Sequence, residues 1–283
     1  MSDCGCGDKP CTYVGGLDVG STYTKAVILN SEGDIVGRSM CNTGFKLDVA
    51  AQKSFDGALA DAEIDAGKVG YVISTGYGRH QVEFRDITVT ALTAAARGAH
   101  WFFPNTRTVL DIGGQTMKAT KLDDAIKVRS FRLNDKCAAG TGAFLEKTAR
   151  YMNYGTEEIG ELASSSTEDV EISGVCAVFA ESEVINQLSI GSAPADIMHG
   201  AMNSLVGRSL QLMRRIKMEP EYTLIGGIMR FPTMVKALTA ELGEGVNVPE
   251  GDLVQYVGAI GAATLAQQRF GKIEAESAEI IEA

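Results

Sequence analysis

The chain has 283 residues, of which 45% are hydrophobic and 22% are charged. This mixture is typical of a folded globular protein, and the length leaves room for two modest domains. The formal net charge is −10 and the basic residues are scattered along the chain, so neither nucleic acid nor an anionic membrane is expected as a partner. No apolar run approaches the roughly 20 residues of a membrane span, and the amino terminus shows no secretion signal, which together predict a cytoplasmic location.

The first predicted elements form a β-hairpin, because strand-like runs at Tyr13–Val19 and Lys25–Leu29 flank a short turn. Residues 17–26, which cross that turn, read Leu-Asp-Val-Gly-Ser-Thr-Tyr-Thr-Lys-Ala. The elements predicted next are strands near Ile35–Met40 and Val69–Ser74, and helices near Leu47–Ala66 and Thr88–Phe102. The second of these helices is rich in small residues, which suits close packing.

A second segment repeats the pattern of the first. Residues 110–119 read Leu-Asp-Ile-Gly-Gly-Gln-Thr-Met-Lys-Ala, within strand-like runs at Arg107–Ile112 and Thr116–Lys121. Both copies contain Leu-Asp, a β-branched residue, a glycine, four further positions and then Lys-Ala. Because an internal repeat organises a whole fold, two related lobes are expected.

The two turns are predicted to bind the phosphates of a nucleotide. Gly20 and Gly113 let backbone N–H groups approach an anion closely, and Asp18 and Asp111 end strands where a carboxylate suits Mg²⁺ held through water. The other residues assigned to the phosphates are Ser21, Thr22, Thr24 and Lys25 in the first copy, and Gly114, Gln115, Thr116 and Lys118 in the second. A single hairpin favours an ordinary glycine turn, but two with matched spacing favour a phosphate site. Neither copy is a P-loop, because the chain has no G-x-x-x-x-G-K-[ST] segment.

Catalysis is assigned to Asp18 and Asp111, through the metal, and to Gln115. Gln115 lies in the second turn. It either orients the attacking water, as a glutamine does in some nucleoside triphosphatases, or serves as a plain phosphate donor. Both roles stay open at this stage.

Strands and helices alternate along the rest of the chain, which predicts an α/β fold. The elements expected there are helices near Phe144–Met152, Ala180–Leu188, Ala195–Lys217 and Gly258–Gln268, and a strand at Tyr222–Ile225 that ends in Gly226-Gly227. The expected organisation is a cysteine-containing tail at 1–12, a first lobe at 13–103 completed by 256–271, a second lobe at 104–255, and an acidic tail at 272–283.

Two of the six cysteines, Cys137 and Cys176, lie at or near predicted helix starts. A helix amino terminus stabilises a thiolate, and four cysteine thiolates are the usual ligands of an iron–sulfur cluster. A twofold dimer with one shared cluster would supply four. The alternative is two buried structural cysteines. The loop-like Gly140, Thr141 and Gly142, a few residues beyond Cys137, are assigned to the nucleotide site.

The most specific motif is Asn-Asp-Lys-Cys-Ala-Ala-Gly-Thr-Gly, residues 134–142. Six further segments are compared together with this motif: Leu17–Lys25, Ser74–Gly78, Val109–Lys118, Cys176–Asn186, Gly226-Gly227 and Gly258–Ala263. In these segments the chain resembles the ATP-dependent activators of 2-hydroxyacyl-CoA dehydratases and the ATP-binding subunits of benzoyl-CoA reductases. These proteins belong to the acetate kinase, sugar kinase, Hsp70 and actin superfamily.

The resemblance implies a two-lobed actin-like ATPase fold made of duplicated ribonuclease H-like domains, with ATP and Mg²⁺ in the cleft between the lobes. Gly226 and Gly227 would contact the nucleotide. Cys137 and Cys176 would hold a [4Fe–4S] cluster shared with a second copy or a related subunit. Electrons from a ferredoxin-type donor would pass, driven by ATP hydrolysis, to a CoA-thioester reductase or dehydratase.

Departures from the activator pattern favour a benzoyl-CoA-reductase-type subunit, with a separate dehydratase activator as the alternative. They are Ala91 and Ala95, and the Gly-Gly-Ile-Met-Arg-Phe-Pro segment at 226–232, and residues 247–253 also look similar to the reductase branch. A further departure is Cys4, Cys6 and Cys11, which either bind metal or are incidental thiols on a tail.

Two other functions share parts of this pattern. A small-molecule kinase of the same superfamily would keep both hairpins but would have no need of Cys137 and Cys176. A nucleotide-driven structural or chaperone protein is the third possibility.

Overall fold

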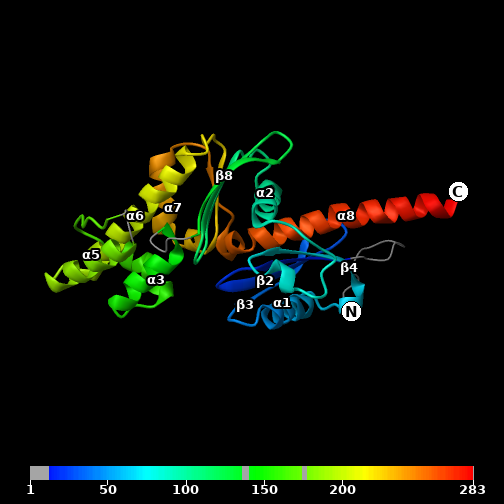
Figure 1. Ribbon diagram of the computed structural model, residues 1–283, viewed down its shortest axis with the longest axis horizontal. Coiled ribbons are helices and arrows are strands. Elements are labelled where there is room, and N and C mark those ends of the chain that lie inside the picture. Colours follow the sequence, from blue (N-terminus) through cyan, green and yellow to red (C-terminus); the bar gives the residue numbers. More distant parts are fainter. Residues whose placement is uncertain (1–12, 136–139, 174–176, 283) are drawn as a thin grey trace. The chain divides into compact units, whose positions relative to one another are not determined.

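The computed structural model describes residues 13–135, 140–173 and 177–282. The chain divides into two compact units, coloured along the sequence in Figure 1. Unit 1 comprises Met1–Trp101 and Tyr256–Ala283, and unit 2 comprises Phe102–Gln255. Cys137 and Cys176 lie outside the described residues, as do the cysteines of the amino-terminal tail.

Unit 1 is built on a five-stranded sheet in the order β3-β2-β1-β4-β5. Its strands are β1 (Tyr13–Val19), β2 (Tyr23–Leu29), β3 (Ile35–Asn42), β4 (Val69–Gly76) and β5 (Ile87–Thr88). Its helices are α1 (Leu47–Asp61), α2 (Ala91–Phe102) and α8 (Val257–Glu282), with short 3₁₀ turns η1 (Ala66–Lys68) and η2 (Arg79–Gln81).

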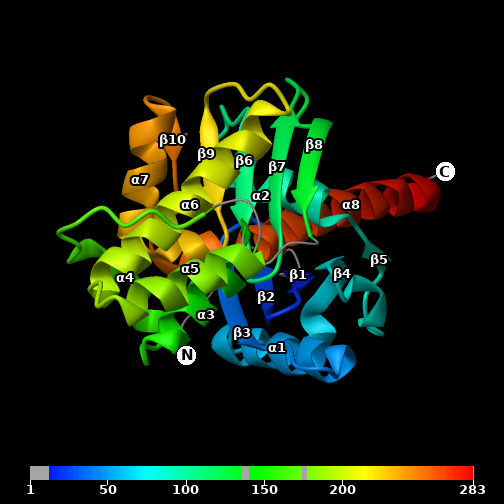
Figure 2. The ribbon, with the colours of Figure 1, turned by 60° about the vertical axis from the view of Figure 1, so that its left-hand side comes forward.

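Two adjacent glycines of β1 show how helices cover both faces of this sheet. A Cβ on Gly15 would lie 3.1 Å from Phe55 of α1, whereas one on Gly16 would lie 2.1 Å from the Ala259 carbonyl of α8. Successive strand residues point to opposite faces, so α1 and α8 pack on opposite sides (Figure 2). The carboxy-terminal helix therefore packs tightly onto the first lobe, as its glycines and alanines predict.

Unit 2 repeats this plan with a sheet in the order β10-β9-β6-β7-β8. Its strands are β6 (Thr108–Ile112), β7 (Met117–Leu122), β8 (Val128–Asn134), β9 (Tyr222–Ile225) and β10 (Val246–Asn247). Its helices are α3 (Gly142–Tyr151), α4 (Ile159–Ser164), α5 (Ala177–Ser189), α6 (Pro194–Arg214) and α7 (Pro232–Leu242), with 3₁₀ turns η4 (Thr156–Glu158), η5 (Gly227–Arg230) and η6 (Gly251–Gln255).

The repeat seen in the sequence is therefore a repeat of whole sheets. In each unit three antiparallel strands come first in the chain, and two parallel strands follow beside the first of them. The register agrees as well, because Asp18 faces Lys25 across β1 and β2, and Asp111 faces Lys118 across β6 and β7. Each sheet carries its own buried apolar cluster, around Leu17 and Phe55 in unit 1 and around Leu110 and Phe144 in unit 2.

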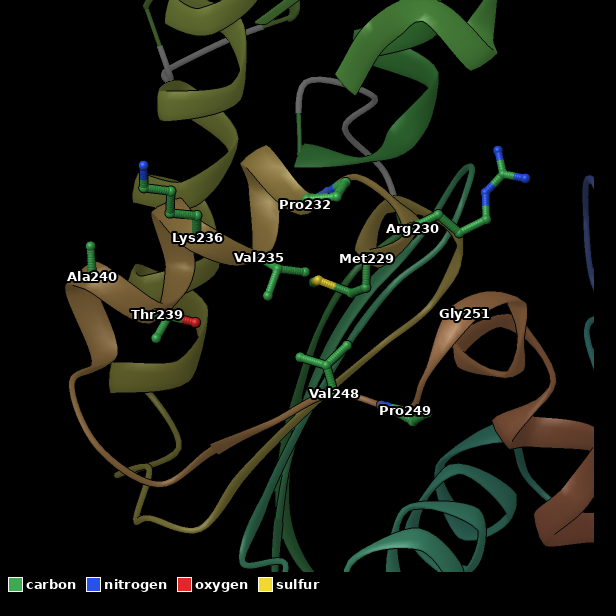
Figure 3. Close-up of a pocket in the computed structure, with 10 residues that line it drawn as sticks. All are labelled: Met229, Arg230, Pro232, Val235, Lys236, Thr239, Ala240, Val248, Pro249 and Gly251. Carbon is green, nitrogen blue, oxygen red and sulfur yellow. The ribbon is translucent and has the colours of Figure 1, made fainter. Parts of the chain in front are cut away.

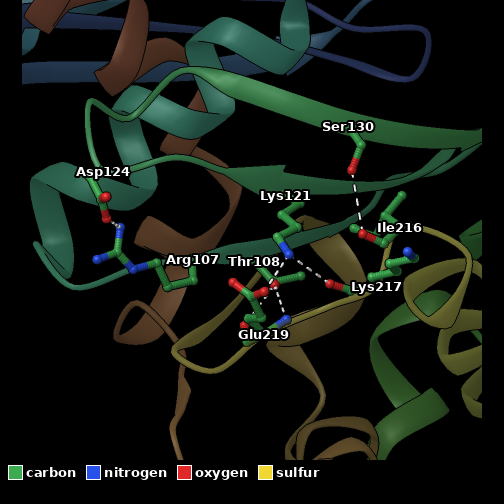
Figure 4. A network of polar contacts seen from close by, with 8 residues as sticks. All are labelled: Arg107, Thr108, Lys121, Asp124, Ser130, Ile216, Lys217 and Glu219. Carbon is green, nitrogen blue, oxygen red and sulfur yellow. Dashed lines mark hydrogen bonds and ion pairs between the residues drawn. The ribbon is translucent and has the colours of Figure 1, made fainter.

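A polar network fixes the segment that leads from α6 into β9 (Figure 4). The Thr108 hydroxyl donates to the Glu219 carbonyl at 2.7 Å and accepts from the Glu219 N–H at 2.9 Å. The Lys121 ammonium donates to the Lys217 carbonyl at 3.1 Å and pairs with the Glu219 carboxylate. These contacts position β9, and with it the glycines that follow β9.

Several predicted bounds differ from the structure. Thr88 is in β5, paired with Ser74, and α2 begins only at Ala91. The helix predicted at Gly258–Gln268 continues to Glu282. The strands and α-helices that the sequence pattern missed are β5, β8, α4, α7 and β10. In the part of the chain that is described, no helix is long and apolar enough to cross a membrane.

Candidate functional site

The first turn is closed by one backbone hydrogen bond. The Gly20 N–H donates to the Tyr23 carbonyl at 3.1 Å, and a Cβ on Gly20 would lie 2.7 Å from that oxygen. Between them Ser21 is exposed and Thr22 is half-buried. The turn therefore needs glycine for its own closure and leaves the Ser21 backbone and hydroxyl open to a ligand.

The second turn is closed in the same way. The Gly113 N–H donates to the Thr116 carbonyl at 2.8 Å. Gly114 and Gln115 form the tip, and the Gln115 side chain is exposed. The two turns thus agree in hydrogen bonding as well as in sequence, and both end a strand that carries an aspartate.

Each aspartate is paired with the lysine across the hairpin. The Lys25 ammonium lies 3.9 Å from the Asp18 carboxylate, and the Lys118 ammonium lies 2.7 Å from the Asp111 carboxylate. All four side chains are partly exposed. Directly opposed cross-strand pairs of unlike charge stabilise a hairpin. The two carboxylates also lie beside the turns, where a Mg²⁺ bound to phosphate would need oxygen ligands or acceptors for the hydrogen bonds of its water molecules.

A glycine with positive φ lies against each aspartate. Gly76 (φ +89°) follows the residue of β4 that pairs with Asp18, and a Cβ there would lie 2.5 Å from the Asp18 Oδ1. Gly226 (φ +99°) follows the residue of β9 that pairs with Asp111, and a Cβ there would lie 2.9 Å from the Asp111 Oδ1. Gly76 is thus the counterpart of Gly226. Gly226 was among the site residues predicted from the sequence, whereas Gly76 was missed. The signal that could have found it is its place in the chain, because Gly76 ends the buried strand β4 and Gly226 directly follows the buried strand β9.

The Gly226-Gly227 turn lies at the end of the second hairpin. A Cβ on Gly226 would lie 2.3 Å from the Ile112 carbonyl, which directly precedes Gly113. The Gly226 N–H donates to the Val254 carbonyl at 3.0 Å, and Gly227 opens η5. The predicted nucleotide contacts Gly113, Gly226 and Gly227 are therefore brought together within unit 2.

The start of α3 is bonded to the second turn. The Gly142 N–H donates to the Gly113 carbonyl at 3.0 Å, and the Ala143 N–H donates to the Gly114 carbonyl at 2.7 Å. The first N–H groups of a helix have no partner inside the helix, and here the turn supplies it. Gly140, Thr141 and Gly142 are all buried. The structure places Gly142 behind the turn as its support, and Gly140 and Thr141 directly precede it.

Thr24 is placed away from the turn. Its side chain is fully buried, and its hydroxyl lies 2.9 Å from the Thr43 hydroxyl. β2 begins at Tyr23, so Thr24 and Lys25 point to opposite faces of the strand. We therefore leave Thr24 out of the proposed phosphate contacts.

A salt bridge joins the two helices that follow the cysteine motifs. The Lys147 ammonium of α3 donates to the Glu181 carboxylate of α5 at 2.7 Å, and this hydrogen bond raises the pKa of Lys147. The Glu183 carboxylate accepts a hydrogen bond from the Ser173 N–H, just before the segment of Cys176. Both glutamates thus make specific contacts, in addition to any effect on the helix dipole.

The cysteine ligands predicted from the sequence lie outside the described residues. Within residues 13–135, 140–173 and 177–282, no group of three or more His, Cys, Asp and Glu side chains is placed to hold a metal ion. Cys41 lies inside β3, where its thiol donates to the Ala50 carbonyl at 3.4 Å and burial raises its pKa. These contacts are consistent with a structural role for Cys41.

A pocket of about 690 Å³ lies between α7 and the segment that leads into η6 (Figure 3). Met229, Val235 and Val248 point toward one another across it, and Lys236 stands at its edge. The Arg230 guanidinium is directed away from this space and pairs with the Glu157 carboxylate at 2.9 Å. The pocket is thus mainly apolar and begins directly after the Gly226-Gly227 turn.

Residues 16–266 match the sequence model of the BadF/BadG/BcrA/BcrD ATPase family. The chain is 38% identical to the 2-hydroxyisocaproyl-CoA dehydratase activator of Clostridioides difficile, over 90% of this chain and 94% of that protein. It is 32% identical to a benzoyl-CoA reductase subunit from Thauera aromatica, over 93% of this chain and 95% of that protein.

Solved structures agree with this relationship. The activator of the 2-hydroxyisocaproyl-CoA dehydratase from Clostridium difficile, solved with bound ADPNP, superposes with a TM-score of 0.87 at 35% identity, covering 94% of this chain and 98% of the other. A ROK family glucokinase from Streptomyces griseus superposes with a TM-score of 0.55 at 16% identity, covering 90% and 99%, which shows the fold alone. The predicted actin-like ATPase fold is confirmed.

The comparisons correct the branch expected from the sequence. The activators are the relatives with the higher identity, and the reductase subunit is more distant. The interpretation as a dehydratase activator is therefore favoured over the reductase-type subunit that residues 226–232 had suggested.

Proposed function

Because this chain belongs to the BadF/BadG/BcrA/BcrD ATPase family, we propose that it hydrolyses ATP to drive electrons into a 2-hydroxyacyl-CoA dehydratase. The observation that carries the ATP part is the pair of matched turns, each with a strand-ending aspartate, a cross-strand lysine and a backbone-closed glycine turn. The activators named among the relatives support the dehydratase as the partner.

In this proposal the backbone N–H groups at Ser21 and Gly114 bind phosphate oxygens. Asp18 and Asp111 hold Mg²⁺ through water, since both carboxylates are partly exposed at the ends of their strands. Gln115 is exposed at the tip of the second turn, and it orients the attacking water.

The hydrogen bonds at the start of α3 give nucleotide state a route to the cysteine motif. The Gly113 and Gly114 carbonyls accept from the first two N–H groups of α3, so a shift of the turn shifts the helix start. The salt bridge between Lys147 and Glu181 transmits that shift to α5.

Two cysteine thiolates per chain fit a [4Fe–4S] cluster if a second copy supplies the other two. Cys137 and Cys176 are the residues that would hold it. In the sequence Cys137 comes five residues before Gly142, where α3 begins, and Cys176 comes directly before Ala177, where α5 begins. The cluster would supply one-electron chemistry at low potential. A ferredoxin-type protein is the proposed donor.

The first test is the iron and acid-labile sulfide content of anaerobically purified protein. We expect about two irons per chain, lost in Cys137→Ala and in Cys176→Ala. Cys41→Ala is the matched control, because Cys41 lies in β3 and should leave the iron unchanged. Protein free of iron in the absence of oxygen would refute the redox proposal and favour a small-molecule kinase.

A second test separates the activator from a fixed reductase subunit. Reduced protein with ATP should start catalysis by a separately purified 2-hydroxyacyl-CoA dehydratase and should then dissociate from it. Stable co-purification with a CoA-thioester reductase, without dehydratase activation, would instead support the reductase-type subunit.

A further inference from the structure

The strand β8 is at one end of the unit 2 sheet (Figure 2). It has seven residues, Val128–Asn134, and pairs with β7 on one side. Within the part of unit 2 that the structure describes, no strand pairs with its other side. A hollow of about 430 Å³ follows its residues 129–133. A strand at the end of a sheet presents a row of backbone N–H and C=O groups that can pair with another chain.

The register determines which backbone groups of β8 face outward. The Gly113 N–H donates to the Thr116 carbonyl at 2.8 Å, so these two residues form a hydrogen-bonded pair at the turn between β6 and β7. Bonded and non-bonded pairs alternate along antiparallel strands, so the even-numbered residues of β7 bond to β6 and the odd-numbered ones bond to β8. Those odd-numbered residues pair with even-numbered residues of β8. The N–H and C=O groups of Phe131 and Leu133 therefore face the open edge.

The side chains of this strand are exposed on both faces of the sheet. Phe131 is 43% exposed and Leu133 is 44% exposed, and they share one face because successive strand residues alternate. Ser130 and Arg132 are on the other face. There the Ser130 hydroxyl donates to the Ile216 carbonyl at 3.4 Å, whereas Arg132 is exposed. The edge thus offers apolar contacts on one face and a cation on the other.

The edge is basic in a chain whose net charge is −10. Residues 127–134 include Lys127, Arg129 and Arg132 and no acidic residue. The Arg132 guanidinium donates to the Phe131 carbonyl at 2.9 Å, so it lies beside the open edge. Cross-strand pairs of unlike charge are stabilising and pairs of like charge are destabilising. The charge of this edge therefore favours an acidic strand beside it.

We propose that β8 binds an extended acidic segment of a partner protein, which adds to the unit 2 sheet as a further strand. Its backbone would bond to the outward N–H and C=O groups of Phe131 and Leu133, and this ladder supplies affinity. Its apolar side chains would contact Phe131 and Leu133 on one face, and its carboxylates would pair with Arg132 on the other. The segment therefore alternates apolar and acidic residues. This inference goes beyond the proposed ATPase function and does not depend on it.

Two other occupants fit the edge less well. The acidic carboxy-terminal residues 272–282 of this chain belong to the helix α8, so they offer no extended backbone. A second copy of the edge would bring two sets of three basic residues together. The remaining alternative is that the basic residues only keep copies of the protein apart, as charged edge residues do, and then no acidic peptide binds.

The first test measures the binding of fluorescent peptides to the anaerobically purified full-length protein by fluorescence anisotropy. One peptide alternates valine and glutamate, and its control alternates valine and lysine. We expect only the glutamate peptide to bind. Arg132→Glu should raise its Kd about tenfold, because a cross-strand pair of unlike charge becomes a pair of like charge. Arg269→Glu, which changes an exposed arginine of α8, is the matched control and should leave Kd unchanged.

A pair of variants at Leu133 separates the backbone from the side chain. Leu133→Ala and Leu133→Pro both lose the leucine, but only the proline variant also loses the N–H that faces the open edge. Proline is tolerated at an edge strand where the N–H faces solvent. We expect weaker peptide binding by the alanine variant and none by the proline variant. Thermal unfolding of each variant tests the fold, and Arg132→Glu still decides the question if the proline variant does not fold.

Four outcomes would overturn the proposal. They are the absence of peptide binding by the wild-type protein, equal binding of the glutamate and lysine peptides, and equal peptide binding by the two Leu133 variants. The fourth is self-association of the wild-type protein, measured by sedimentation, that Arg132→Glu abolishes, because this would assign the edge to a second copy.

Discussion

The two phosphate turns have the same hydrogen bond and register but different surroundings. In unit 1 the turn carries hydroxyl residues, and its Asp–Lys pair is open at 3.9 Å. In unit 2 the turn carries Gly114 and Gln115, and the pair is closed at 2.7 Å. Behind Asp18 lie Gly76 and Gly258, the latter in the first turn of α8, whereas behind Gly113 lies the start of α3.

This difference indicates a division of roles between the copies. The first turn is backed by α8, a helix that packs along its sheet through Ala259 and Ala263, so it is fixed to the frame of unit 1. The second turn shares two backbone hydrogen bonds with α3, and α3 shares a salt bridge with α5. We infer that the second turn, and not the first, relays nucleotide state to α3 and α5, the helices that follow the cysteine motifs.

The largest expected effect comes from removing the charge at the metal. Asp18→Asn and Asp111→Asn should each lower kcat for ATP hydrolysis about a hundred- to a thousandfold, by analogy with the loss of other preorganised electrostatic groups. The measurement is steady-state hydrolysis over a range of Mg²⁺ concentrations. Asp124→Asn, on an exposed loop of unit 2, is the control. An effect of Asp111→Asn without one of Asp18→Asn would break the equivalence of the two copies.

A steric test addresses Gly226, the glycine beside Asp111. Gly226→Ala combines a positive φ with a Cβ 2.3 Å from the Ile112 carbonyl, and we expect it to lower the free energy of unfolding by about 4 kcal/mol. Gly243→Ala has a similar φ of +80° with nothing within 4 Å of the Cβ, so it isolates the backbone part, about 1–3 kcal/mol. Denaturant unfolding of both variants gives the difference. Equal destabilisation would show that contact with β6 is unimportant.

The relay between α3 and α5 should affect coupling more than hydrolysis. Lys147→Met and Glu181→Gln each break the salt bridge, and we expect ATP hydrolysis to persist while electrons delivered per ATP fall by a few-fold. The double variant should resemble each single one, because all three lack the same interaction. Additive losses in the double variant would argue against the relay. Lys236→Met, at the edge of the pocket beside α7, serves as the control.

Local pattern was enough to predict the hairpins. Each hairpin is one continuous segment, Tyr13–Leu29 or Thr108–Leu122, so the local alternation and the glycines specify it directly. The strand Tyr222–Ile225 was also predicted with its observed bounds. Thr24 was assigned to the turn because β2 was predicted to start at Lys25, whereas the strand begins at Tyr23.

The rest depended on contacts between distant residues. Gly76 meets Asp18 only through parallel pairing of β4 with β1, and the start of α3 is held by a turn nearly thirty residues earlier in the chain. β8 was missed because Arg129, Phe131 and Leu133 of this edge strand are all exposed, so it lacks a clean apolar alternation. No local pattern carries such information.

The smallest expected effect concerns the stability of unit 2 at acid pH. Asp196, in the first turn of α6, accepts hydrogen bonds from the N–H groups of Glu168 and Thr167 and from the Ser166 hydroxyl, and these lower its pKa. A lowered pKa stabilises the fold fully above the unfolded value of about 3.9, and this stabilisation is lost as the pH falls through the lower folded value. Asp196→Asn should therefore reduce stability at neutral pH and flatten its fall below about pH 4. The loop at 166–168 precedes α5 in the chain and contains none of the proposed Mg²⁺ ligands, so this variant should leave the Mg²⁺ dependence of hydrolysis unchanged. A changed Mg²⁺ dependence would mean that the anchoring of this loop also acts on the nucleotide site.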